Sequence, residues 1–198
     1  MTERSLAAQL AAVRPTRRTE AKLSRKKPRV SREEAEQAIF RRFVEAYAGH
    51  YSAELTNVIH RDAPDFSAID SITGQTLGIE VTGAYQDERE AEINYWLEGE
   101  WGTIVGNVAG LIANINSALI DKAEKAKSYE KIGPLLLVIY IGSFIFHHET
   151  DMMFIVPSLS IPPNHYSLIS LVITDERGEV PKIQVLQEVP GWREGGSA

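Results

Sequence analysis

Apolar residues recur at helical spacing in the segment that begins at Ser31. Ser31 stands three residues before Glu34, the spacing of a capping box that satisfies free backbone N–H groups at the start of a helix. The pattern ends near Gly49. We therefore predict a helix over residues 31–49, and its apolar face is formed by Ala35, Ile39, Phe43 and Ala46.

Two short segments, 64–69 and 76–81, carry β-branched residues next to the separator Asp-Ser-Ile-Thr-Gly at residues 70–74. The separator has the composition of a turn, so the two segments are predicted to pair as an antiparallel hairpin. A weaker β pattern at residues 54–60 predicts a strand before the hairpin.

After the hairpin, residues 84–102 follow no clear period and are acidic and aromatic. They are interpreted as the start of a helix or as a surface loop. Three of their aromatic residues could stack on nucleic-acid bases, and a core or lid role fits them at least as well. These residues are Tyr95, Trp96 and Trp101.

The second half of the chain opens with a long helical pattern over residues 103–131, ended by the Gly-Pro pair at 133–134. Residues 135–141 form a continuous apolar run, which is typical of a strand buried on both faces. Two more strands are predicted at 167–174 and 182–187.

This order of elements predicts an α/β fold in which a mixed sheet is flanked by helices. The chain of 198 residues is long enough for one domain with a substantial core. We expect that domain to span residues 31–189, between a disordered N-terminal arm at 1–30 and a disordered tail at 190–198.

The formal net charge of −6 conceals a strong asymmetry along the chain. Residues 1–30 contain nine Lys or Arg and two Glu, whereas the remainder is acidic. A basic arm of this kind suits contact with a phosphate backbone. The excess of Lys and Arg in residues 1–30 is explained equally well by a terminus that merely aids solubility.

Composition also narrows the class of protein. The chain has no cysteine, which excludes disulfides, thiolate metal sites and a cysteine nucleophile. The longest apolar run, residues 134–141, is far shorter than the roughly 20 residues that span a bilayer. The first twenty residues lack the apolar core of a secretory signal. We expect a soluble cytoplasmic protein with no membrane partner.

Two carboxylates near the ends of the predicted hairpin carry the candidate chemistry. Asp65 opens the first strand and Glu80 lies late in the second, so antiparallel pairing can bring them together. Glu80 stands between Ile79 and Val81, where a carboxylate is costly unless it is paired or bound to a metal. Two such carboxylates can hold the Mg²⁺ or Mn²⁺ that phosphodiester hydrolysis uses.

The residues Pro64-Asp65, fourteen intervening residues and then Glu80-Val81-Thr82 resemble the motif of the PD-(D/E)xK nuclease superfamily. The order of predicted elements from Ser31 to Gln187 is similar to the αβββαβ core of these restriction-endonuclease-like proteins. The resemblance implies a metal-dependent nuclease in which Asp65 and Glu80 bind the metal.

The chain departs from this motif because Thr82 stands where the motif places its lysine. In the superfamily that lysine helps polarise the attacking water or stabilise developing charge. On the long helix, at about 100° per residue, Lys122 falls almost at the centre of the apolar stripe and Lys125 at its edge. We expect Lys122 to reach the two carboxylates and to replace the missing lysine, with Lys125 as the second candidate.

Structural alternatives exist at each of these positions. Asp65 can be a turn residue after Pro64, and Glu80 can form a purely structural ion pair with Lys122. Glu36 could be an acidic member of the site or a solvated helix charge. Thr82 could bond to a metal-bound water, and β-propensity alone also explains it.

The predicted function is a Mg²⁺- or Mn²⁺-dependent nuclease whose partner is nucleic acid, with DNA preferred. A homodimer would supply the two active sites that paired cuts in duplex DNA require. One alternative is an inactive nuclease-fold module that binds nucleic acid or a partner protein, and the missing motif lysine supports it. A weaker one is a structural or regulatory subunit without nucleic-acid contact.

Overall fold

The computed structural model describes residues 31–88, 90–91 and 106–194. Their helices and strands follow in the order α2 (Arg32–Tyr51), β1 (Leu55–His60), β2 (Phe66–Asp70), β3 (Thr76–Ala84), α4 (Val108–Lys125), β4 (Leu135–Ile141), α5 (Met152–Ile155), β5 (Leu168–Thr174) and β6 (Pro181–Glu188). Short 3₁₀ turns adjoin α4 and α5. No helix within the described residues is long and apolar enough to cross a membrane.

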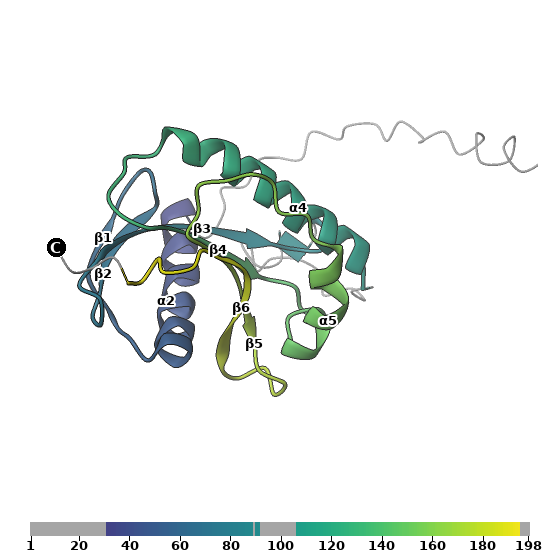
Figure 1. The fold of residues 1–198 in the computed structure, drawn as a ribbon. Coiled ribbons are helices and arrows are strands. Elements are labelled where there is room, and N and C mark those ends of the chain that lie inside the picture. The colour runs from purple at the N-terminus through teal and green to yellow at the C-terminus, as the bar shows by residue number, and fades with distance from the viewer. Residues whose placement is uncertain (1–30, 89, 92–105, 195–198) are drawn as a thin grey trace, which may run out of the picture.

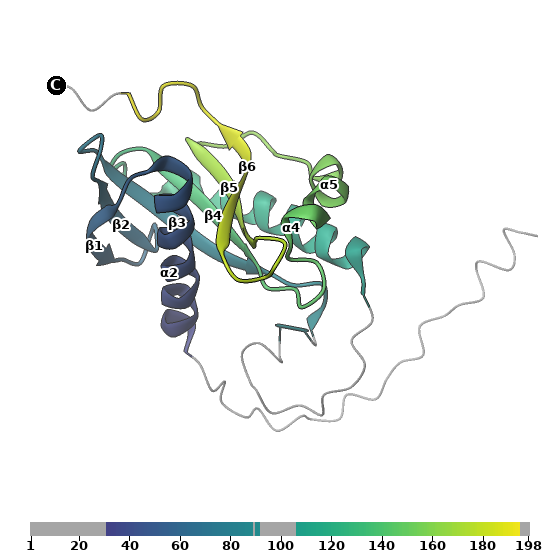
Figure 2. The same ribbon diagram turned by 90° about the horizontal axis from the view of Figure 1, so that it is seen from below.

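The six strands form one sheet in sequence order, β1 to β6. β1, β2 and β3 pair antiparallel, β3, β4 and β5 pair parallel, and β6 returns antiparallel to β5. Helix α2 covers one face of this mixed sheet, while α4 and α5 lie over the other (Figures 1 and 2). The predicted α/β fold with a mixed sheet flanked by helices is confirmed.

The apolar run of β4 is buried on both sides, as its sequence predicts. Leu136 and Val138 face the core under α2, whereas Leu137, Ile139 and Ile141 face the core under α4. Each of these side chains is at most 1% exposed. Because successive side chains of a strand point to opposite faces, a strand between two helical layers must be apolar at every position.

The predicted start of α2 is confirmed in detail. The Ser31 hydroxyl accepts a hydrogen bond from the Glu34 N–H at 3.1 Å, and the Glu34 carboxylate accepts one from the Ser31 N–H at 2.7 Å. The helix ends at Tyr51, beyond the predicted Gly49, where Ser52 adopts a left-handed conformation with φ of 52°.

Helix α4 is shorter than the predicted 103–131. Among the described residues it begins at Val108, where the Asn107 side chain accepts a hydrogen bond from the Gly110 N–H at 2.9 Å. It ends at Lys125, because the Ser128 hydroxyl bonds to the Lys125 carbonyl and the chain tightens into a 3₁₀ turn. Residues 103–105 lie outside the described residues.

The segment after Pro190 packs on the domain, although the sequence predicted a disordered tail there. Trp192 is buried, and its indole N–H bonds to Glu188 at 2.8 Å. The Arg193 guanidinium bonds to the fully buried Asp70 carboxylate at 2.8 Å. Residues 195–198 lie outside the described residues, as do the arm at 1–30 and the aromatic residues Tyr95, Trp96 and Trp101.

Asp70 is the buried anchor of this C-terminal segment. Burial alone would raise the pKa of Asp70, but hydrogen bonds from Tyr47, the backbone and Arg193 together hold that pKa below its usual range. The Tyr47 hydroxyl donates to Asp70 at 2.5 Å. The carboxylate is therefore charged at neutral pH, and Arg193 compensates its charge.

Replacing Arg193 by Ala should lower the free energy of unfolding by about 2 kcal/mol, since a hydrogen bond to a buried charged group is worth about 1.5–3 kcal/mol. Urea denaturation at pH 7.5 measures the change. Arg41→Ala is the matched control, because Arg41 is exposed on α2 and its loss should cost less than about 0.5 kcal/mol. Equal stabilities of the two variants would show that the C-terminal segment does not anchor the domain.

Candidate active site

The β2–β3 hairpin aligns the two predicted carboxylates. Phe66 pairs with Ile79, so the same antiparallel register places Asp65, the residue directly before β2, opposite Glu80. Residues opposite one another on neighbouring strands point to the same face of a sheet, with their Cβ atoms about 5 Å apart. The predicted approach of Asp65 to Glu80 is present.

Both carboxylates are buried, with residue exposures of 1% for Asp65 and 3% for Glu80. Ile79 and Val81 belong to the core under α2, so Glu80 between them points to the face that α4 covers. Asp65 accepts a hydrogen bond from the Val81 N–H at 2.9 Å. This bond fixes Asp65 beside the strand that carries Glu80.

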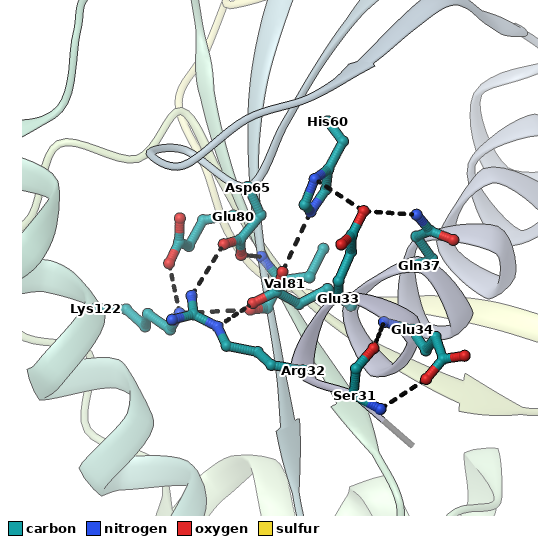
Figure 3. A network of polar contacts seen from close by, with 11 residues as sticks. Ser31, Arg32, Glu33, Glu34, Gln37, His60, Asp65, Glu80, Val81 and Lys122 are labelled. Carbon is teal, nitrogen blue, oxygen red and sulfur yellow. Dashed lines mark hydrogen bonds and ion pairs between the residues drawn. The ribbon is translucent and has the colours of Figure 1, made fainter. Parts of the chain in front are cut away.

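Lys122 reaches Glu80 from α4, as its position on the helix predicts. Its ammonium donates to Glu80 Oε1 and lies 3.4 Å from the Val81 carbonyl oxygen (Figure 3). The buried side chains of Leu111, Ile115 and Leu119 hold this face of α4 against the sheet. Because Lys122 follows them on the same stripe, its side chain is only 13% exposed.

The remaining predicted residues lie at the edge of this cluster. Thr82 is half-buried, two residues beyond Glu80 on the same strand face. Lys125 is exposed and makes no ion pair with either carboxylate among the described contacts.

Glu36 is a member of the cluster rather than a solvated helix charge, since its side chain is only 15% exposed. It accepts a hydrogen bond from Arg32 Nε at 2.5 Å and contacts His60 Nε2 at 3.3 Å. Arg32 in turn lies 3.6 Å from Asp65 Oδ1 (Figure 3). A chain of polar contacts therefore joins the end of β1, the first turn of α2 and Asp65.

Arg32 is not among the site residues that the sequence predicts, although a signal was present. Arg32 stands four residues before Glu36 on the helix that Ser31 caps, the spacing at which side chains meet. The Glu36 carboxylate raises the pKa of Arg32 through this contact, so the guanidinium stays charged. Nothing in the sequence placed this turn of α2 next to the hairpin.

The electrostatics of the two carboxylates are unequal. Burial and the charge of Glu80 raise the pKa of Asp65 to about 6, against the opposing effects of the Val81 N–H and Lys122. Burial and the charge of Glu80 also raise the pKa of Tyr129. Two adjacent carboxylates that repel one another in a buried setting are a common signature of a functional site.

A cleft of about 760 Å³ opens beside this cluster, between the first turn of α2, the second half of β3 and one side of α4. Arg32, Val81, Thr82 and Lys122 line it, whereas Asp65 and Glu80 do not. The carboxylates therefore lie behind the two cationic side chains that contact them. A ligand in the cleft would meet Arg32 and Lys122 first.

Asp65 and Glu80 provide oxygen donors of the kind that Mg²⁺ or Mn²⁺ binds. Glu80 Oε2 is buried and makes no hydrogen bond of ordinary geometry within the described residues, although Tyr129 lies close enough to Glu80 for the carboxylate to raise the Tyr129 pKa. Asp65 and the Val81 carbonyl supply further oxygens, and Mg²⁺ in proteins is held by one or two carboxylates and several waters. Within the described residues, no three His, Asp or Glu side chains cluster as a protein-only metal cage.

No model of a protein family, no curated protein and no solved structure shows significant similarity to this chain.

Asp65→Asn should stabilise the metal-free protein at pH 7.5 by about 1–3 kcal/mol, because a shift of one pKa unit corresponds to about 1.4 kcal/mol. A carboxyl whose pKa is raised by folding favours the folded state below its ordinary pKa and loses that contribution as pH rises through about 6. The advantage of Asn should therefore vanish as pH falls from 7 to 4. Urea denaturation in EDTA across this range measures it.

A destabilised Asp65→Asn protein at every pH would contradict this interpretation. It would mean that Asp65 stabilises the fold through its contacts with the Val81 N–H and Arg32. The ionised carboxylate would then not lower the free energy of unfolding.

Proposed function

We propose that the protein is a metal-dependent nuclease with a divergent PD-(D/E)xK site on a restriction-endonuclease-like core. The order α2, β1, β2, β3, α4 and β4, with an antiparallel β2–β3 hairpin and β4 parallel to β3, supports the αβββαβ core that the motif implies. The observation that carries the proposal is the meeting of Lys122 with the Asp65–Glu80 pair from a separate helix.

Asp65 and Glu80 would hold Mg²⁺ or Mn²⁺, with the Val81 carbonyl as a further oxygen ligand. Such an ion, when bound, draws charge from the phosphoryl oxygens and lowers the pKa of a coordinated water. The protein's own task is to exclude bulk water and to fix the groups that surround the phosphate. The elements on both sides of the site, β3 and α4, are packed into the core, which favours fixed positions of the side chains that they carry.

Lys122 would take the role of the lysine that Thr82 replaces in the motif. Its ammonium lies between Glu80 Oε1 and the Val81 carbonyl, close to the oxygens that would hold the ion. A cation in this place can orient the attacking water or stabilise negative charge that develops on the phosphate. Thr82 would support the role of Lys122 through a hydrogen bond to a metal-bound water.

A second candidate is an inactive nuclease-fold module that binds nucleic acid or a partner protein. It is favoured by the contacts of the two carboxylates, because Lys122 already pairs with Glu80 and Arg32 lies near Asp65. A structural ion-pair network needs no metal. Binding that is metal-independent and is lost on removal of residues 1–30, from a protein that cuts nothing, would select this candidate.

Wild-type protein should cut labelled nucleic acid in Mg²⁺ or Mn²⁺ and not in EDTA. Glu80→Gln and Lys122→Ala should each reduce the cleavage rate by at least about 100-fold, since positioned acid–base groups typically contribute factors of this size or more. Lys125→Ala is the matched control on α4 and should retain the rate. Gel assays with single-stranded DNA, duplex DNA and RNA measure the rates, and circular dichroism checks folding.

Cleavage that survives Glu80→Gln would exclude this site as the source of activity. Cleavage that survives Lys122→Ala but is lost in Lys125→Ala would move the lysine role to the edge of the helix. No cleavage of any substrate by folded wild-type protein would select the inactive module.

A further inference from the structure

Among the described residues, two cationic side chains lie between the cleft and the carboxylates. Asp65 and Glu80 are at most 3% exposed and do not line the cleft, whereas Arg32 and Lys122 contact them and do. A phosphate that enters the cleft therefore meets Arg32 and Lys122 beside the carboxylate oxygens. The nucleic-acid strand that carries this phosphate has to bend into the cleft.

The size of the cleft limits what such a chain can be. At about 760 Å³ the cleft falls within the roughly 300–1,000 Å³ of sites that hold small molecules. Duplex DNA has a persistence length of about 50 nm, and bending it by 40–90° to bring its backbone into such a site costs roughly 1–6 kcal/mol. A single strand can turn its phosphate and base inward at low cost, as strands do in enzymes that act on unpaired nucleotides.

The lining of the cleft carries charges of both signs. The cations are Arg32, Lys122 and Lys125, and the acidic residues are Glu36, Asp87, Glu88 and Asp121, of which Glu36 is paired with Arg32. A polyanion is attracted to the first group and repelled by the second. One phosphate can therefore be held between the cationic side chains, with the remaining cleft left for a sugar and base.

Arg32 is suited to hold that phosphate. Its side chain is 80% exposed, yet its guanidinium is oriented by Glu36 at 2.5 Å, which His60 contacts in turn. A planar guanidinium held in this way binds phosphate oxygens through paired N–H groups. Tyr85 also lines the cleft, and its ring packs against Gly83 and Gly142.

We propose that the cleft binds single-stranded nucleic acid and that Arg32 and Lys122 hold one phosphate of the strand between them. This inference rests on the proposed nuclease function, and it specifies the substrate class and a phosphate-positioning residue, Arg32. Duplex nucleic acid would bind elsewhere on the protein and more weakly.

The test is fluorescence anisotropy with a labelled single-stranded oligonucleotide and its duplex, in Ca²⁺ and in EDTA, as a function of salt concentration. The full chain is used as wild type, Arg32→Ala and Arg41→Ala. Arg41 is the matched control because it is an exposed arginine on the same helix that does not line the cleft. All three proteins keep residues 1–30, so any contribution of that basic arm is common to them.

Wild type should bind the single strand at least about tenfold more tightly than the duplex. Arg32→Ala should weaken single-strand binding by about tenfold, reduce the slope of log K against log salt by about 1, and leave duplex binding unchanged. Arg41→Ala should match wild type for both probes.

Equal or tighter binding of the duplex would overturn the proposal, as would equal single-strand affinities of Arg32→Ala and Arg41→Ala. The outcome does not depend on cleavage. A protein that cuts duplex DNA with no effect of Arg32 refutes this inference alone, whereas Arg32-dependent single-strand binding without any cutting refutes only the nuclease.

Discussion

The buried contact between Glu80 and Lys122 is the interaction on which the organisation of this site depends. A carboxylate between two core residues of a central strand is costly in free energy unless a positive charge compensates it. Lys122 is the cation that meets Glu80, and it does so from a helix far along the chain. The pair therefore specifies which turn of α4 lies over β3, and the wall of the cleft follows from that placement.

Asp65 distinguishes this arrangement from an ordinary buried ion pair. One lysine and one glutamate would balance in charge, but a second carboxylate beside them repels Glu80, and together with burial this raises the pKa of Asp65 to about 6. Arg32 compensates only in part, because its 80% exposed side chain is screened by water. Such an excess of buried negative charge costs stability, and a bound cation would remove the cost.

Much of the fold and the centre of the site could be predicted from sequence because both depend on local patterns. The hairpin register followed from a turn of polar residues, and the position of Lys122 followed from a helical count of about 100° per residue. Arg32 was not predictable, since its role depends on how α2 packs beside the hairpin. The contact of Arg193 with Asp70 joins residues 123 positions apart, for which no periodicity gives a signal.

The most direct test of the account is a crystal structure of the protein soaked with Mn²⁺, with anomalous scattering recorded for that ion. If Asp65 and Glu80 hold a metal, an anomalous peak should appear beside these two residues and should be lost in Glu80→Gln. An empty site at saturating Mn²⁺ in wild type, with Lys122 still bound to Glu80, would contradict it. The pair would then be a structural ion pair and nothing more.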